Sequence, residues 1–513
     1  MSFPWLTALV LLPLLGAVVI AFLPKTPGAA LPKQVALAVS GATLLLAGLL
    51  GARFDVGGGW QFEEVHQWIN SFGVHYALGV DGLGLVMVLL TALLVPLVVI
   101  SSWHDADERS TGSFFAWVLG LEAASMAVFM ATDVFLFYVV FEATLIPAYF
   151  LIGGWGGAQR SRAAIKFLLY QLAGGLIMLV SVIGLYVVSA DAGHPTYLLS
   201  DLAAMDIDPI TQRWLFVGFF IAFAIKAPMF PVHTWLPDTT AQATSGTNVL
   251  LVCVLDKIGT FGMLRFCLGL LPDASQWATP VVVVLALISI VYGALVAIGQ
   301  SDVMRLIGLT SLSHFGFIVL GIFVFSTQGS SGAVLYMVNH GIGTAALFFL
   351  AGYLIKRTGT AEIGAYSGVE KVTPVLAGLF LVAGLAACGL PGLSPFVSEF
   401  LVLVAAFQHA WWVGAVAVSA IVLAAIYVLW LYQRTMTGPT SESVSGLVDL
   451  NRRELIAVAP LIAALLVFGF YPKPLLDTIN PYVQDTLSHV GVADPSPTVG
   501  HVEHATDAEG GSE

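Results

Sequence analysis

The sequence predicts an all-α polytopic membrane protein with about fourteen transmembrane helices. Of its 513 residues, 58% are hydrophobic and only 10% are charged, a balance that soluble domains of this length do not show. Apolar runs of about 20 residues, enough to cross roughly 30 Å of hydrocarbon, recur between Phe3 and Tyr471. Lysine and arginine gather in alternate loops between these runs, as expected of a chain that crosses a bilayer repeatedly.

Fourteen runs have the length and apolar character of a span. In order, they are 3–23, 34–52, 80–103, 113–131, 133–153, 164–189, 213–230, 241–271, 278–299, 302–325, 331–355, 372–407, 411–433 and 454–471. No lysine or arginine precedes the first run and no small-residue cleavage site follows it. We therefore expect a retained first span instead of a cleaved signal peptide.

The orientation follows from the loops, because lysine and arginine stay on the cytoplasmic side. Thirteen of them lie in one alternate set of loops, namely Lys25, Lys33, Arg109, Arg160, Arg162, Lys166, Arg305, Lys356, Arg357, Lys371, Arg434, Arg452 and Arg453. The opposite loops hold Arg53, Arg213 and Lys473. Both termini are then predicted to be non-cytoplasmic. Residues 473–513 are predicted to be an acidic, mostly disordered tail, and the net charge of −12 argues against nucleic acid as a partner.

An internal repeat divides the chain. Residues 132–153 can be aligned with 301–321, and 168–175 with 334–341, at offsets of 169 and 166 residues. The predicted organisation is spans one to three in 1–111, a five-span repeat in 112–271, a second one in 278–434, and a fourteenth span in 452–472. A unit with an odd number of spans inserts upside down the second time, so the two repeats are predicted to be inverted.

Paired prolines interrupt spans seven and twelve of this plan. They are Pro228 and Pro231 in the first repeat and Pro391 and Pro395 in the second. Proline leaves a carbonyl without its helical partner, which is tolerated in a membrane where protein or water satisfies it. We predict two discontinuous helices, although an ordinary kink is the alternative.

Six ionisable residues lie at roughly the same depth in six different spans. They are Glu142, Lys226, Lys257, His314, His340 and Glu399. Lys226, for example, is about twelve residues into its span, or ~18 Å deep. A charge in hydrocarbon costs several kcal/mol and persists mainly where it has a partner or a function.

Groups at one depth describe a row within the membrane plane, with access to each surface at separate points. Carboxyl, amine and imidazole groups can all exchange protons, so we predict a proton pathway. The alternatives are a static ion pair between Glu142 and Lys226, and hydrogen-bonding core histidines at 314 and 340.

Other polar residues have weaker claims. Glu122 and His233 are candidates for proton access, although a loop histidine such as His233 can simply be solvated. Asp133 and Asp302 are predicted to be helix N-caps. Asp256 is next to Lys257, but successive helical residues point about 100° apart, so direct pairing is doubtful.

Cofactor-binding patterns are missing from the sequence. Cys253, Cys267 and Cys388 show no CxxC spacing, so we interpret them as small apolar residues. The sequence also has no GxGxxG motif after a strand and no histidine pair with haem-like spacing. We expect no cofactor and no metal in this chain.

Several stretches together resemble one family, the antiporter-like, proton-translocating subunits of respiratory complex I and of multisubunit cation/proton antiporters. They are LFYVVFEATLIPAYFLIGGWGG (136–157), FAIKAPMFPVHTWLPDTTAQA (223–243), DKIGTFGMLR (256–265), SLSHFGF (311–317), NHGIGTAALFFLAG (339–352) and LPGLSPFVSEFLVL (390–403). The resemblance covers about spans three to thirteen and is greatest to the M-type branch of bacterial NADH-quinone oxidoreductase, whose members carry glutamate where Glu399 stands.

The resemblance implies roles and partners. Glu142 and Lys226 would be a coupling pair, Lys257 the central relay, His314 and His340 its extension, and Glu399 the terminal group. NADH, FMN, iron–sulfur clusters and quinone would belong to partner subunits, with antiporter-like L and N subunits on either side in the bacterial cell membrane. A subunit of a multisubunit Na⁺/H⁺ antiporter or a membrane-bound hydrogenase is the alternative.

The sequence departs from the family pattern at a few positions. Thr244 replaces a usual proline, Gln242 a frequent glutamate, Asp256 an apolar residue and Pro395 a common glycine. These departures put the geometry of the cytoplasmic mouth and of the second helix break in doubt, and leave the proposed relay residues untouched.

Overall fold

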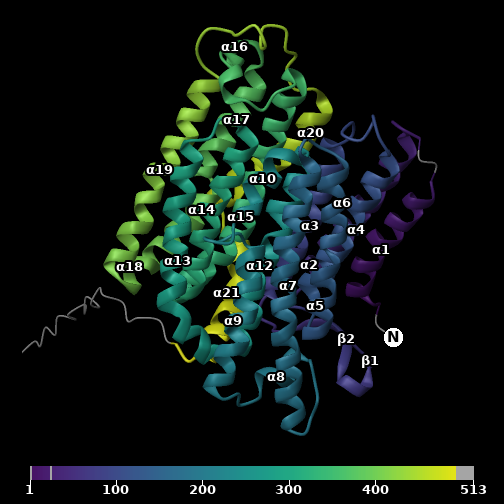
Figure 1. The fold of residues 1–513 in the computed structure, drawn as a ribbon, viewed down its shortest axis with the longest axis vertical. Coiled ribbons are helices and arrows are strands. Elements are labelled where there is room, and N and C mark those ends of the chain that lie inside the picture. Colours follow the sequence, from purple (N-terminus) through teal and green to yellow (C-terminus); the bar gives the residue numbers. More distant parts are fainter. Residues whose placement is uncertain (1–2, 24–25, 493–513) are drawn as a thin grey trace, which may run out of the picture.

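Long helices run side by side through most of the molecule (Figure 1). The structure is a computed structural model that describes residues 3–23 and 26–492. In Figure 1 the short helix α16 (Val369–Val372) lies at the upper end of the bundle, and the short helix α8 (Leu199–Ala203) lies at the lower end. The bundle axis is therefore the direction in which the apolar helices would cross a membrane.

The N-terminal part contains three long helices and a hairpin. The helices are α1 (Trp5–Phe22), α2 (Ala30–Arg53) and α3 (Gly82–Ser101). Strands β1 (Gln61–Ile69) and β2 (Val74–Val80) pair antiparallel between α2 and α3. The turn between the strands ends at Gly73, which has a φ of +65°, and a Cβ there would lie 2.1 Å from the Pro195 carbonyl oxygen. Only glycine fits this close approach.

The next part, from α4 to residue 268, contains a helix break after Lys226 and an irregular helical segment over residues 245–268. Its regular helices are α4 (Thr111–Met130), α5 (Val134–Ala143), α6 (Leu145–Gly154), α7 (Arg160–Asp191), α9 (Pro209–Lys226) and α10 (Trp235–Gln242). After α11 (Ser245–Asn248), π-helical turns over Val249–Leu255 and Met263–Leu268 flank α12 (Lys257–Gly262). Such wide turns often occur at functional sites.

The third part, from α13 to α19, contains the most deeply buried helices. Its members are α13 (Pro272–Ile298), α14 (Val303–Phe323), α15 (Thr327–Thr358), α17 (Pro374–Ala387), α18 (Ser394–His409) and α19 (Trp411–Thr435). The apolar parts of α14 and α15 are completely buried. These two helices form the centre of the bundle and carry both histidines of the predicted row.

Two further helices follow, α20 (Arg452–Phe470) and α21 (Lys473–Val490). The prediction of a mostly disordered tail from residue 473 is wrong for α21. Ile479, Val483, Leu487 and Val490 recur at helical spacing and are all buried, so they form an apolar stripe. The rest of the predicted tail, residues 493–513, lies outside the described residues.

The prediction of a polytopic helical membrane protein is confirmed in its main feature, since eleven helices in the described residues are long and apolar enough to cross a membrane. The other three predicted runs, 213–230, 241–271 and 372–407, coincide with α9, with the π-helical segment, and with the broken pair α17 and α18. The strictly all-α prediction is wrong at the hairpin, where β-branched and aromatic residues such as Val65 and Trp68 favour strands.

Candidate functional site

The helix that carries Lys226 ends where the prolines predicted a break. Lys226 is the last residue of α9, and Ala227, which precedes Pro228, has an extended ψ of 97°, as the residue before a proline prefers. The Trp235 indole N–H donates to the Ile225 carbonyl at 3.0 Å, and the Phe230 N–H donates to Ser289 Oγ at 3.0 Å. These two backbone groups of the break are thus satisfied within the protein, as membrane burial requires.

Lys226 is completely buried but is held by a hydroxyl, not by a carboxylate. Its Nζ donates to Thr144 Oγ1 at 3.1 Å and lies 4.5 Å from the centre of the Phe141 ring. Among the ion pairs of the described residues, none joins Lys226 to Glu142. The static ion pair considered from the sequence is therefore not formed, although the charge of Glu142 still acts on Lys226.

Glu142 lies near the end of α5 and is half-buried. Its Oε1 has no hydrogen-bond partner among the described residues. The carboxyl occupies space that Gly175 of α7 leaves open, since a Cβ on Gly175 would lie 1.6 Å from Glu142 Oε1. Gly175 therefore sets the position of the Glu142 side chain.

Substitution of Gly175 by valine is expected to displace the Glu142 carboxyl and to lower the activity of the assembled protein about ten-fold, because a misplaced acid–base group loses most of its contribution. The matched control is Gly120→Val, in the middle of α4, where an added Cβ meets nothing within 4 Å. If the chain works as the resemblance implies, the measurement is NADH-driven proton uptake by membrane vesicles at equal protein content. Equal uptake by both variants would show that Gly175 does not position Glu142.

Lys257 makes a direct contact with His340. Lys257 Nζ lies 2.6 Å from His340 Nδ1 and donates to the Val252 carbonyl at 3.0 Å, a carbonyl of the preceding π-helical turn. Two nitrogens at this distance share a single proton, because two N–H groups pointing at each other would repel. The proton can reside on either partner, so this contact is suited to proton transfer.

A continuous series of side chains leads from His340 to Glu399. The rings of His340 and His314 are 5.1 Å apart, and those of His314 and Tyr336 are 5.8 Å apart. The Tyr336 hydroxyl donates to Glu399 Oε1 at 2.5 Å. All of these side chains are buried. Lys257, the two histidines and Glu399, which the sequence placed on four separate spans, are thus brought into one row.

A small cavity adjoins this row next to the second helix break. Its lining includes His314, Tyr336, Asn339, His340 and Pro395, and its free volume is about 10 Å³, close to what one water molecule needs. His340 Nε2 and Asn339 Oδ1 have no protein partner among the described residues. A water molecule there would have polar groups to bind.

The second break separates α17 from α18. The interval after Ala387 contains Pro391 and also Gly389, whose φ is +68°. Pro395 belongs to the first turn of α18 instead, where proline is well tolerated. A Cβ on Gly389 would lie 1.9 Å from Glu399 Oε2. The break therefore provides the space that the Glu399 carboxyl occupies.

Two of the weaker candidates, Glu122 and His233, have no hydrogen bond, ion pair or ring contact with a member of the row in the described part of the structure. Glu122 is buried and neither of its carboxyl oxygens has a partner within the described ranges. His233 is 4% exposed and packs against Phe230 and Tyr292. The alternative that His233 is a solvated loop residue is therefore wrong. The N-cap prediction is confirmed for Asp133 and Asp302, which accept the N–H groups of Leu136 and Arg305.

Arg265 differs from the two lysines, because it has a carboxylate partner. Its guanidinium forms two hydrogen bonds with buried Asp81, of 2.6 and 2.8 Å. This geometry is that of a fixed ion pair that joins two elements. By contrast, no carboxylate of the described part of the chain lies within 4.0 Å of either buried lysine.

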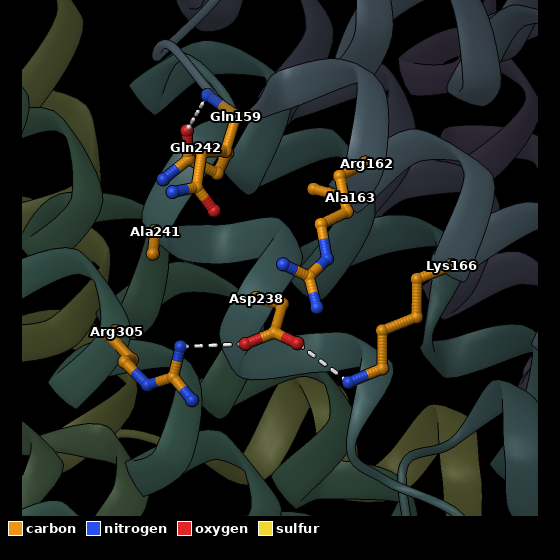
Figure 2. Close-up of a pocket in the computed structure, with 8 residues that line it drawn as sticks. All are labelled: Gln159, Arg162, Ala163, Lys166, Asp238, Ala241, Gln242 and Arg305. Carbon is orange, nitrogen blue, oxygen red and sulfur yellow. Dashed lines mark hydrogen bonds and ion pairs between the residues drawn. The ribbon is translucent and has the colours of Figure 1, made fainter.

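A charged pocket of about 320 Å³ lies between α7, α10 and α14. Figure 2 shows Asp238 of α10 between Lys166 and Arg305, at 2.6 and 2.7 Å, with Arg162 beside them. Burial opposes the charge of Asp238, but the hydrogen bonds and charges of Lys166 and Arg305 outweigh it and lower its pKa. All three cations belong to the loop set that the sequence analysis predicted to be cytoplasmic. The pocket is therefore a candidate mouth on that side.

Sequence reasoning missed the uncharged members of the site. Thr144, Tyr336 and Tyr427 were not singled out, yet Tyr427 OH lies 3.3 Å from His314 Nε2 and the other two bind Lys226 and Glu399. For Tyr336 a signal was present, because it precedes His340 by one helical turn in α15. Side chains four residues apart share a helix face.

Comparison with known proteins places this chain in a family. Residues 131–424 match the family described as "NADH:quinone oxidoreductase/Mrp antiporter, TM". NADH-quinone oxidoreductase subunit M of Mycobacterium tuberculosis is 50% identical over 98% of each chain, and that of Rhodobacter capsulatus is 40% identical over 93% of this chain and 95% of the relative.

Solved structures agree with these sequence relatives. A chain of respiratory complex I from Thermus thermophilus with bound NADH has a TM-score of 0.87 at 34% identity, covering 95% of this chain and 100% of that one. A chain of the Mrp complex from Dietzia has a TM-score of 0.82 at 23% identity, covering 96% and 100%. The chain therefore belongs to the NADH:quinone oxidoreductase/Mrp antiporter family of membrane subunits, and within it is similar to subunit M of NADH-quinone oxidoreductase.

Proposed function

We propose that this chain is a proton-pumping membrane-arm subunit of NADH:quinone oxidoreductase. Protons move along the row from Glu142 and Lys226 through Lys257, His340 and His314 to Glu399. The observation that carries the proposal is the contact between Lys257 and His340, with 2.6 Å between the two nitrogens. Among the six residues of the proposed row, it is the one hydrogen bond between two members that the described part of the structure contains.

Lys226 and Glu142 form the switch of this mechanism. A buried lysine keeps its proton when a carboxylate approaches and releases it when the carboxylate withdraws. Glu142 Oε1 has no hydrogen-bond partner among the described residues, and the Glu142 side chain is only half-buried. A change at the surface of the protein next to Glu142 can therefore move its carboxyl. Thr144 is the one hydrogen-bond partner that Lys226 has among the described residues, and a small shift of α5 changes the charge environment of Lys226.

Energy for the pump has to come from elsewhere, because moving one charge against 100 mV costs ~2.3 kcal/mol. We place the NADH, FMN, iron–sulfur clusters and quinone in partner subunits. The described residues contain no group of three or more His, Cys, Asp or Glu side chains that could hold a metal ion. On this proposal the chain is a non-redox translocase subunit that lies between L-type and N-type subunits, with both termini on the non-cytoplasmic side of a bacterial cell membrane.

We also propose fourteen spans arranged with two inverted five-helix repeats. Matching backbone contacts support the repeat. Val134 N–H donates to the Tyr197 carbonyl at 2.9 Å, and Val303 N–H donates to the Ala361 carbonyl at 3.0 Å. In the chain, the acceptor of the first contact precedes α8 and the acceptor of the second precedes α16, and these two short helices lie at opposite ends of the bundle in Figure 1.

Replacement of Lys257 by methionine tests the proposal. Methionine fits the space but cannot hold a proton, so proton uptake per NADH oxidised by the assembled complex is expected to fall several-fold. Thr260→Val is the matched control, because Thr260 is buried one turn away from Asp256 and its hydroxyl has the Lys257 carbonyl as its one hydrogen-bond partner among the described residues. An unchanged proton yield in Lys257→Met would refute the relay.

The second candidate is a Na⁺/H⁺ antiporter subunit or a membrane-bound hydrogenase subunit, since the family includes antiporters. A carboxylate at 399 favours the M-type assignment. A proton yield that depends on sodium, in vesicles that lack other sodium transporters, would favour the antiporter instead.

A further inference from the structure

Asp256 is a buried carboxyl that the row described so far does not use. It lies between the π-helical segment 249–255 and α12, and it is 1% exposed. Neither of its carboxyl oxygens has a hydrogen-bond or ion-pair partner among the described residues. Unpartnered buried carboxyls are rare and require an explanation.

Asp256 lies close enough to both buried lysines for their charges to act on it. Lys257, its neighbour in the chain, points to His340 on α15. Successive residues in a helix point about 100° apart, so the carboxyl of Asp256 faces a different direction. The charges of both Lys257 and Lys226 act on it.

Backbone packing brings Asp256 close to the end of α9. A Cβ on Gly259 of α12 would lie 2.4 Å from the backbone nitrogen of Ala227, the residue after Lys226. A Cβ on Gly262 would lie 2.3 Å from the Phe223 ring. These two glycines let α12, which begins directly after Asp256, touch the end of the helix that carries Lys226.

The row has a gap at this place. Lys226 binds Thr144, and Lys257 binds His340 and the Val252 carbonyl. No contact in the described structure joins the two lysines directly. Asp256 is the titratable group whose charge interacts with both.

We propose that Asp256 is a proton station between Lys226 and Lys257. This inference rests on the proposed function and adds a residue to it. In the first step an N–H bond of the Lys226 ammonium breaks and an O–H bond forms on the Asp256 carboxylate, which leaves a neutral amine and a carboxylic acid. In the second step the acid gives this proton to the neutral Lys257 amine, and Asp256 becomes a carboxylate again.

The charge arrangement suits this role. The negative charge of the Asp256 carboxylate stabilises a proton on either lysine. Once Asp256 is itself protonated, this stabilisation is lost, and the state in which both lysines are charged is disfavoured. Protons are then passed singly. A hydroxyl or amide at 256 would lack this property, because it takes up no net proton.

The test uses the assembled complex in membrane vesicles, with NADH as the electron donor. Asp256→Asn keeps the size of the side chain and removes its proton exchange. We expect proton uptake to fall about ten-fold. This loss is smaller than the roughly 10²–10⁴-fold that a positioned acid–base group can contribute, because water can bridge part of the gap between the two lysines. Asp256→Glu is expected to restore at least half, and Thr260→Val to leave uptake unchanged.

Every outcome decides between roles. If Asp256→Asn pumps normally while Lys226→Met fails, Asp256 is no station and the proposed function stands. If both pump normally, the proposed function itself fails. If Asp256→Glu is as inactive as Asp256→Asn at equal complex content, the residue is structural. Should Asp256→Asn not assemble, Asp256→Ser replaces it, and normal pumping by that variant would overturn the proposal.

Discussion

A complex that carries Lys226→Met is expected to assemble, but its rates of proton uptake and of coupled quinone reduction are each expected to fall more than about ten-fold. The reason is that Lys226 is completely buried and its Nζ has Thr144 as its hydrogen-bond partner, so that methionine fills its space and removes its proton. The loss is at the scale of a positioned acid–base group. Initial rates of NADH oxidation and of proton uptake, measured on the same vesicles, check this expectation.

Lys226→Arg separates a proton carrier from a fixed charge. Arginine keeps the positive charge but does not release its proton in proteins. If Lys226 works as a proton carrier, Lys226→Arg is expected to pump as poorly as Lys226→Met. Normal pumping by the arginine variant would mean that a static charge suffices, and the switch between Glu142 and Lys226 would be wrong.

Substitution of Glu399 by glutamine is expected to block transfer to a similar degree. The amide oxygen can still accept the Tyr336 hydroxyl that now lies 2.5 Å from Oε1, so packing is retained while proton exchange is lost. Glu399→Asp is expected to keep part of the activity. Glu399→Lys should assemble but pump poorly, because the charged forms of the two side chains have opposite signs. The measurement is proton uptake alongside NADH oxidation.

Tyr336→Phe is the companion variant for Glu399. It removes only the hydroxyl that joins the aromatic and histidine side chains to the carboxyl. Partial loss of proton uptake is expected, with assembly unchanged. If Glu399→Gln matches the unmodified complex in both rates, Glu399 is structural and the row ends elsewhere.

The sequence predicted those parts of the fold and site that depend on strong local signals. Apolar runs fixed the positions of the long helices, and Pro228 and Pro391 marked the two breaks, because a proline cannot continue the hydrogen-bond pattern of a helix. Lys257, His340 and Glu399 stood out because charged groups are costly inside a membrane.

Other features could not be predicted, for physical reasons. Whether Glu142 touches Lys226 depends on the packing of α5 against α7 at Gly175, which no local pattern reveals. Tyr336 is uncharged, and aromatic residues are common in apolar spans, so its link to Glu399 had no signal of its own beyond the helical spacing to His340. The π-helical turn over Val249–Leu255, next to Asp256, contains no proline or glycine that would have predicted it.

The central claim is that protons pass through this chain along one row of side chains in series. The measurement that tests it most directly is proton uptake per NADH for His340→Gln, Glu399→Asp and the double variant, in assembled complex at equal content. Steps in series predict that the double variant loses little more than the worse of the two single variants, because one slow step already limits the path. Losses that multiply would show two independent routes, and single variants that pump at the unmodified yield would show that protons do not use this row.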